Sequence, residues 1–500
     1  MNIRNCNVFD ALFQPVPTGD WTLLGHLFAG ICLLVGLAEI LRLWLNGPRE
    51  VTRKIVHVLV GVMASAGTVW LETALPLALL GAVFTVVNTV ALRQGWFKSM
   101  HGDGRSLGTP LYPLSFLVLV LFCWPDRGVI VAAMLVLAFG DVGAAGVGGG
   151  VARPHRYVLI ADSKSWEGSA AMFVISGVVL LLVFHLFPFE VPIEAPVYLM
   201  VPVTALVATA AEALSRRGSD NVSVPLVTAF MLWYMMHHAP DANLMLAMGT
   251  VLGGLVAVLS WRVGLLTGSG AVATFWLAVP VFGFGGWMWT APMVTFFVLS
   301  SLLSKVGRRV KAQYDLMFEK GDRRDWAQVI ANGGIAGGLM VLFAISGDPD
   351  LYLYYCIALA AATADTWATE LGTLSKGQPR LVTTFRKVAA GTSGGVTVVG
   401  LLGAFAGALV IAMVGWLWVG DAQMILWVIL SGVAGSLVDS FLGATVQGQF
   451  RCSMCEQVTE KRLHCEGART DLLSGVSWIR NDVVNFSSVV GAVLFCYLLR

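Results

Sequence analysis

Charged side chains stand beside glycines at a few places in a chain that is otherwise strongly apolar. Asp141 follows an apolar run, and glycines alternate with basic residues as far as residue 157. The segment "SKSWEGSAAMF" at 163–173 then adds Lys164 and Glu167. Glycine lets backbone N–H groups approach phosphate oxygens, lysine neutralises phosphate, and carboxylates hold magnesium. These residue types suit phosphoryl transfer, which depends mostly on positioning and electrostatics.

The second half of the chain carries a set of the same kind. "ATADTWATELG" at 362–372 ends an apolar run, and the segments "FRKVAAGTSGG", "GSLVDSFLGATVQGQ" and "WIRNDVVNF" follow it. Taken singly, each feature has a structural alternative, because glycine packs membrane helices and loop cations mark topology. Ionisable residues at span ends are costly, however, so the repetition of the whole set predicts two functional sites.

The composition excludes a water-soluble fold. The chain is 57% hydrophobic and 12% charged, with a mean hydropathy of +0.77, whereas soluble proteins carry about 25% charged residues. Its apolar runs have the length of membrane helices and lack the alternation of membrane β-strands. We expect an all-α polytopic membrane protein of about 16 transmembrane helices in two halves, located in the plasma or inner membrane if the source is bacterial. No cleavable signal peptide is expected in residues 1–20.

Basic residues predict the orientation of these spans. Of the 32 Lys and Arg residues, all except Arg4, Arg127 and Arg500 fall in connections that are separated from one another by an even number of spans. These connections therefore lie on the same side of the membrane. The positive-inside rule makes that side cytoplasmic and places both termini outside. The connections at 148–167, 372–392 and 447–481, and with them the active sites, are therefore expected at the cytoplasmic face.

The eight cysteines do not indicate a disulfide framework, but one group could hold a metal. "CSMCEQVTEKRLHC" places Cys452, Cys455, His464 and Cys465 in an expected cytoplasmic loop. Thiolates and imidazole at this spacing are suitable ligands for a structural Zn²⁺ ion. The alternative is a loop with three reduced thiols.

The motifs resemble two families of membrane kinases. In the first half, "RKIVHVLVG", "FGD", "SKSWEGSAAMF" and "EALSRRGSDNVSVPL" are similar to the phytol kinase and dolichol kinase family, which uses CTP. In the second half, "DRRDWAQVIANGG", "ADTWATELGTLS", "PRLVTTFRKVAAGTSGGV" and "NDVVNF" resemble the phytyl-phosphate kinase family. The resemblance implies an N-terminal segment at 1–20, a prenyl alcohol kinase domain at 21–258 and a prenyl-phosphate kinase domain at 262–500.

Such a fusion would carry out two consecutive reactions for isoprenoid salvage. A prenyl alcohol, such as phytol or geranylgeraniol, would receive a phosphate from CTP with Mg²⁺, and the monophosphate would receive a second. The expected partners are the alcohol, its monophosphate, a nucleoside triphosphate and the bilayer, with no nucleic acid. Because an alcohol must lose a proton, the first site needs a carboxylate, for which Asp141 or Asp220 is the candidate. The second site needs charge neutralisation, for which Arg386 and Lys387 are candidates.

The resemblance carries over to named residues in three groups. The catalytic candidates are Asp141, Lys164, Glu167, Glu212, Asp220, Asn221, Asp365, Glu370, Asp439 and Asp482. The nucleotide or phosphate ligands would be Arg53, Lys54, His57, Gly148, Gly149, Arg156, Gly168, Arg386, Lys387, Gly391, Thr392, Gly394, Asn481 and Asn485. The magnesium ligands would be Asp141, Glu167, Asp365 and Asp439.

Two other functions remain open on the sequence. A cytidylyltransferase acting on a lipid phosphate shares part of the first pattern and would release pyrophosphate instead of a nucleoside diphosphate. A transporter would also have many spans, duplicated halves and intramembrane carboxylates, although its charges should lie near mid-membrane.

Overall fold

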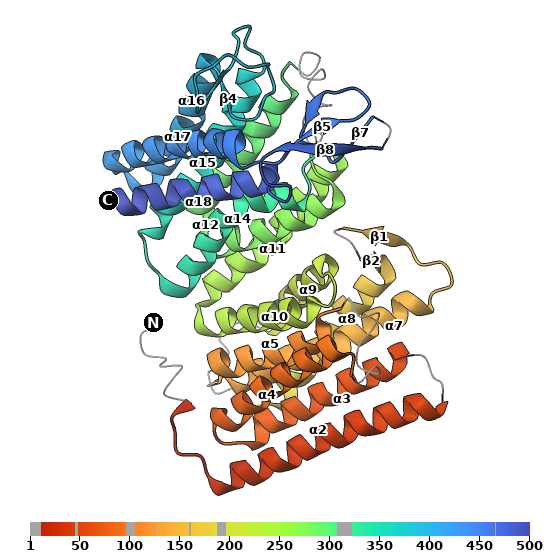
Figure 1. Cartoon of the computed structure of the whole chain (residues 1–500). Coiled ribbons are helices and arrows are strands. Elements are labelled where there is room, and N and C mark those ends of the chain that lie inside the picture. Colours follow the sequence, from red (N-terminus) through yellow and green to blue (C-terminus); the bar gives the residue numbers. More distant parts are fainter. Residues whose placement is uncertain are drawn as a thin grey trace. The chain divides into compact units, whose positions relative to one another are not determined.

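The computed structural model divides into two compact units, Met1–Ala247 and Met248–Arg500. It describes residues 12–45, 49–96, 106–124, 126–159, 162–187, 197–307, 323–465 and 467–500. Parts of the expected N-terminal segment and of the connections at 46–54, 93–109, 148–167, 305–326 and 447–481 lie outside these ranges. Both units consist mainly of helices (Figure 1).

The first unit is built around one broken helix. That helix runs through α6 (Arg127–Leu135), the π-helical turn η2 (Val136–Asp141) and α7 (Val142–Gly150). Nearly all residues of α6 and η2 are buried, and α3, α5, α8 and α10 pack against them. The other helices of this unit are α2 (Thr18–Leu45), α3 (Arg49–Trp70), α4 (Ala74–Gln94), α5 (Gly108–Cys123), α8 (Trp166–Leu186), α9 (Val197–Leu214) and α10 (Asp220–His237).

The second unit is also built around a buried helix. All residues from Tyr355 to Ala364 of α15 (Leu351–Gly372) are buried. The helices that pack against it are α12 (Gly268–Lys305), α14 (Trp326–Ser346), α16 (Val398–Val419), α17 (Ala422–Thr445) and α18 (Asn481–Leu499). Helix α11 (Pro240–Arg262) crosses the boundary between the units along the chain.

Small sheets lie outside the helices. Strands β1 (Arg156–Val158) and β2 (Ser163–Ser165) form a hairpin, and β3 (Arg380–Leu381) pairs with β4 (Gly395–Val396). A four-stranded sheet in the order β6-β5-β8-β7 comprises β5 (Gln449–Cys452), β6 (Val458–Thr459), β7 (Leu463–His464) and β8 (Ala468–Ser474). All the pairings are antiparallel.

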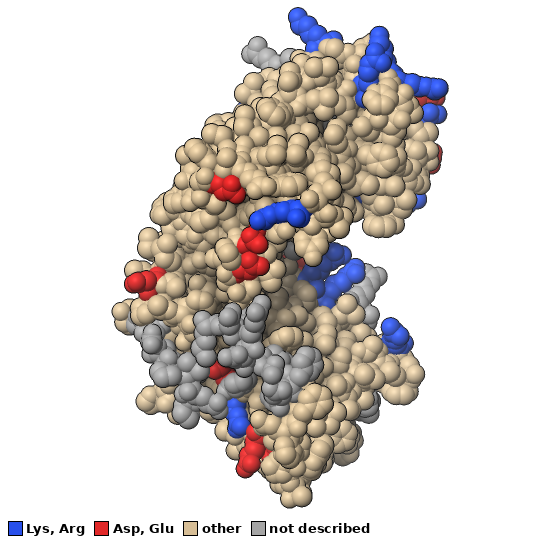
Figure 2. Space-filling view, turned by 90° about the vertical axis from the view of Figure 1, so that its left-hand side faces the viewer, with Lys and Arg blue, Asp and Glu red and all other residues tan. Residues whose placement is uncertain are grey.

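The helices suit a membrane, but the structure does not confirm the expected number of 16. Among the described residues, 11 helices are long and apolar enough to cross a bilayer. Helices α3, α10 and α15 are not among these 11 apolar helices, and each carries charged candidate site residues. Helix α12 also contains two of the expected apolar runs, which meet at the non-helical Gly286 (φ 59°, ψ −155°) and are counted here as one helix. Large apolar side chains are exposed on many helices, and little of the face in Figure 2 is charged, as lipid contact requires.

Candidate active sites

Asp141 lies at the end of the π-helical turn of the first unit, on the wall of a cavity of about 630 Å³. A π-helical turn inserts an extra residue into the helix and is frequent at functional sites. The carboxylate is within electrostatic reach of Lys164, Arg53 and Lys54. Arg53 and Lys54, from the first turns of α3, also line this cavity. The structure thus brings the expected aspartate together with three cations.

The β1–β2 hairpin supplies Lys164 to the same cavity. Lys164 pairs with Tyr157 across the hairpin, and its ammonium contacts the Glu212 carboxylate and donates to Ser215 Oγ at 3.1 Å. The Asp220 carboxylate lies 3.9 Å from the same nitrogen. Burial alone would lower the pKa of Lys164, but the carboxylates outweigh it and the pKa lies above its usual value. The neighbouring carboxylates thus favour the charged form of Lys164, whose side chain is 20% exposed.

The loop before α10 positions Asp220 and Asn221. Gly218 has φ 87°, and a Cβ there would lie 2.5 Å from the backbone nitrogen of Gly108, so only glycine fits. The Asn221 amide donates to the Gly218 carbonyl at 3.1 Å and to Asp220 Oδ1 at 3.2 Å. The "GSDN" segment thereby fixes the Asp220 carboxylate at the cavity wall.

Most of the remaining wall of this cavity is apolar. Ile31 and Val35 of α2, Phe84 of α4 and Phe116 of α5 line it. His57 lines it too, as expected, and its buried Nε2 has no hydrogen-bond partner among the described residues. A cavity of this size, with largely apolar walls and several charged groups, can hold an amphiphilic substrate.

Six expected residues of the first site do not line this cavity: Glu167, Glu212, Gly148, Gly149, Arg156 and Gly168. The expectation of a Gly-rich loop was wrong, because the glycines belong to helix α7. The Glu167 carboxylate, in the first turn of α8, accepts hydrogen bonds from the His155 backbone N–H at 3.1 Å and contacts its ring nitrogen at 2.7 Å. A carboxylate is stabilised at a helix N-terminus, so Glu167 has a structural explanation.

The second unit brings together two aspartates from neighbouring helices. Asp365 of α15 and Asp439 of α17 line a cavity of about 360 Å³ and interact electrostatically. With its amide oriented to satisfy both acceptors, Asn485 donates to Asp439 Oδ2 and to the Asn481 carbonyl, each at 3.1 Å. Paired carboxylates and amides form an oxygen-rich set of the kind that Mg²⁺ prefers.

Several polar residues of this cavity were not singled out from the sequence. They include Arg324, Gln328 and Asn332, at or near the start of α14, and Glu460 in the connection between β6 and β7. Gln328 was detectable as part of the capping box that begins α14, and Asn332 lies one turn further on. The expected Glu370 also lines the cavity, where it accepts from Ser304 Oγ at 2.6 Å and attracts Arg324.

The glycine loop of the second unit lies at the cavity, but its cations do not. Gly391, Thr392 and Gly394 line the cavity as expected. Arg386 and Lys387 are exposed at the tip of the preceding turn and do not line it. Asp482, in the first turn of α18, does not line it either.

The two cavities differ in charge. Four acidic and four basic side chains line the first: Glu50, Asp141, Asp162, Asp220, Arg53, Lys54, Lys164 and Arg217. Among the described residues that line the second, Arg324 is the only cation, against the four carboxylates of Asp365, Glu370, Asp439 and Glu460. A phosphate could enter this second set only with the carboxylates neutralised, which divalent cations do.

The two units repeat one local arrangement. Ser165 caps the N-terminus of α8 by accepting from Gly168 N, and Thr397 caps α16 by accepting from Gly400 N. A Cβ on Gly168 would lie 2.9 Å from the Ala144 carbonyl oxygen, and one on Gly400 would lie 3.0 Å from that of Ala368. Ala144 and Ala368 each follow the site aspartate by three residues. Each unit therefore presses a capped helix against the turn that carries its aspartate.

Comparisons with known proteins agree with this architecture. Residues 251–493 match the family described as Integral membrane protein DUF92. The chain belongs to this family. It is 34% identical over 281 residues to Protein PGR of Arabidopsis thaliana, covering 51% of this chain and 95% of the relative.

The chain is also homologous to phytol kinases. It is 34% identical over 225 residues to Phytol kinase of Synechocystis sp., covering 44% of this chain and 94% of that protein. It is 30% identical over 210 residues to a probable chloroplastic phytol kinase of Triticum aestivum, covering 37% and 68%. No solved structure matched the chain.

Proposed function

We propose that the protein is a membrane phosphotransferase with two sites, which phosphorylates a prenyl alcohol and then the prenyl monophosphate. The observation that supports it most is the first cavity, where apolar walls lead to Asp141, Lys164 and Asp220. The apolar walls suit a prenyl chain, and the charged groups suit a hydroxyl group beside a triphosphate. Homology to phytol kinases supports the same substrate class.

In the first reaction the alcohol oxygen attacks the terminal phosphorus of the nucleoside triphosphate. A new O–P bond forms, the bond to the bridging oxygen breaks, and the nucleoside diphosphate leaves with that electron pair. The hydroxyl proton passes to a carboxylate, Asp141 or Asp220, and then to water. Lys164, Arg53 and Lys54 balance the phosphate charge.

In the second reaction the attacking group is a phosphate oxygen, which needs no base. Asp365 and Asp439 would hold Mg²⁺ with Asn481 and Asn485 nearby, and Arg324 takes the role first expected of Arg386 and Lys387. Mg²⁺ would supply the positive charge that joins the carboxylates to the phosphates of both substrates. We propose CTP as the donor for both steps, on the likeness of the first half to CTP-dependent kinases.

Product analysis tests the proposal. Purified protein is incubated with Mg²⁺, each nucleoside triphosphate in turn, and either phytol, geranylgeraniol or farnesol, and products are identified by mass. We expect prenyl monophosphate and diphosphate, with release of nucleoside diphosphate. Release of pyrophosphate with a nucleotide attached to the lipid would indicate nucleotidyl transfer instead. Absence of any phosphorylated prenol with every donor would refute the kinase function.

A further inference from the structure

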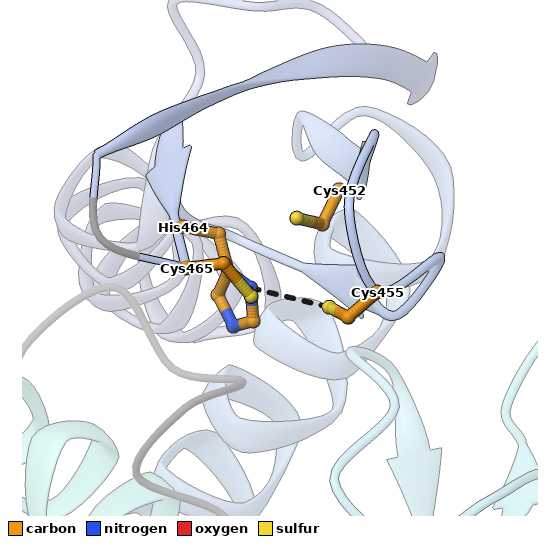
Figure 3. Close-up of side chains that lie close together, drawn as sticks. All are labelled: Cys452, Cys455, His464 and Cys465. Atoms are coloured by element: carbon orange, nitrogen blue, oxygen red, sulfur yellow. Dashed lines mark hydrogen bonds between the residues drawn. The ribbon is translucent and has the colours of Figure 1, made fainter.

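Three cysteines and a histidine meet in the four-stranded sheet of the second unit (Figure 3). Cys452 ends β5 and Cys455 lies in the turn after it, whereas His464 ends β7 and Cys465 follows it. One potential ligand atom from each of the four residues lies within 4.8 Å of all the others. The side chains point toward one another from two separate turns, as Figure 3 shows.

The spacing of these atoms fits a tetrahedral ion. His464 Nδ1 lies 3.5 Å from Cys455 Sγ and 3.2 Å from Cys465 Sγ. Bond lengths of about 2.3 Å to sulfur and about 2.0 Å to nitrogen place tetrahedral ligand atoms about 3.5–3.8 Å apart. The ligand atoms therefore need only small movements to bind Zn²⁺.

The backbone and burial around the cluster point the same way. Glu456 (φ 58°) and Cys465 (φ 38°) adopt left-handed conformations without being glycine, which costs about 1–2 kcal/mol each. Cys452 and His464 are buried, although the sheet has little apolar core beyond Phe450. Most of β8 is exposed. A metal or a crosslink is a common means of stabilising small elements with so little apolar core.

We propose that Cys452, Cys455, His464 and Cys465 form a structural Zn²⁺ site. Four protein ligands leave no open coordination position, so the ion would stabilise the sheet rather than bind substrate. Thiolates and imidazole select zinc over magnesium or calcium, which prefer oxygen. The site would supply folding free energy that the exposed strands cannot.

The zinc site would also hold one wall of the second cavity, a consequence that rests on the proposed function of that cavity. Glu460 lies in the connection between β6 and β7, with one pair of ligands before it and the other after it. Its carboxylate accepts from Ser393 Oγ at 2.7 Å and from Gln447 Nε2 at 2.9 Å. One ion bound to ligands on both sides of Glu460 would hold the two turns together and so hold Glu460 in place between them.

Metal analysis of the full chain tests the site. The protein is purified in detergent under reducing conditions without chelator, and metals are measured by mass spectrometry. We expect one zinc ion per chain in the wild type and at least a tenfold lower content in Cys452→Ser. Met454→Ser changes an exposed residue of the same turn, and Cys123→Ser removes a thiol at the end of α5, so both should keep the zinc.

Two outcomes would overturn the assignment: wild-type protein that is monodisperse without zinc, or Cys452→Ser protein that keeps it. Iron in place of zinc would also reject it. If Cys452→Ser does not fold, Co²⁺ exchanged into the wild type decides, since a tetrahedral thiolate site gives a sulfur-to-cobalt charge-transfer band. Stoichiometric zinc in a protein that phosphorylates no prenyl monophosphate would uphold the site and reject only the function of the second cavity.

Discussion

The Lys164 ammonium and the Glu212 carboxylate form a buried ion pair, with side-chain exposures of 20% and 5%. Breaking such a pair from one side leaves an uncompensated charge and costs about 3–5 kcal/mol, whereas replacing both partners by apolar residues is often neutral. Lys164→Met should therefore lower the thermal stability of the protein, and Lys164→Met with Glu212→Met should restore it. Neither variant should recover the first phosphorylation, because the cation at the phosphate is lost in both.

Thermal unfolding in detergent and product formation from the alcohol check this prediction together. A double variant that regained activity along with stability would mean that Lys164 is only structural. The pH dependence gives a second check. Because the pKa of Lys164 is raised above its usual 10.5, its stabilising charge is present at lower pH and is lost only above that value. Deprotonation of Lys164 should therefore not reduce the stabilisation that the ion pair gives up to about pH 10.

At the residue scale, the sequence located both aspartates and Lys164 because charges are conspicuous in apolar surroundings. The sequence could not distinguish a charged side chain that lines a cavity from one that only stabilises the backbone near it. Glu167 begins a helix and contacts His155, and Arg386 sits at an exposed turn, yet both occur in the expected motifs. Arg324 and Glu460 come from segments distant in sequence, and only tertiary packing brings them to the second cavity.

At the scale of elements, the glycines of α7 distinguish packing from phosphate binding. A Cβ on Gly148 would lie 2.6 Å from Ser165 Oγ, the N-cap of α8, whereas a Cβ on Gly149 would meet nothing within 4 Å. Gly148→Ala should disturb the cap, which costs about 1 kcal/mol. Gly149→Ala should be neutral or stabilising by up to about 1 kcal/mol, since alanine favours helix.

Melting temperatures and first-step rates of the two alanine variants are the measurements. Rates that fall in Gly149→Ala while its stability is kept would show that the backbone there does contact phosphate, contrary to its position in the helix. The glycine run was expected as a flexible loop because its glycines alternate with basic residues. In a membrane, the unsatisfied backbone groups of a loop cost more than the poor propensity of glycine, so the run forms a helix.

At the scale of the whole molecule, the positive-inside bias predicts where the connections lie. We expect the segments 148–167, 372–392 and 447–481 to face the cytoplasm. Single cysteines at exposed positions such as Arg153, Lys376 and Arg469, in a background without other accessible thiols, should react with a membrane-impermeant maleimide only after cells are permeabilised. Labelling of any of the three in intact cells would reverse the orientation of that segment. The helices alone could not show which side of the membrane each connection faces, because an apolar span can be inserted in either direction.

The division into two units predicts that the two proposed reactions are separable, because each unit has its own buried helical stretch that leads to an aspartate. Asp141→Asn keeps the shape of the side chain but removes the charge at the first cavity, and Asp365→Asn does so at the second. Losing such an electrostatic group costs about 10²–10³-fold in rate. We therefore expect Asp141→Asn to block phosphorylation of the alcohol while supplied monophosphate is still converted to diphosphate. In Asp365→Asn, monophosphate should accumulate from the alcohol.

Both products are followed by mass in the same preparation, with a monodisperse elution profile as the check on folding. If either substitution abolished both steps in folded protein, the duplicated motifs would serve one composite site, and the assignment of one reaction to each unit would be wrong.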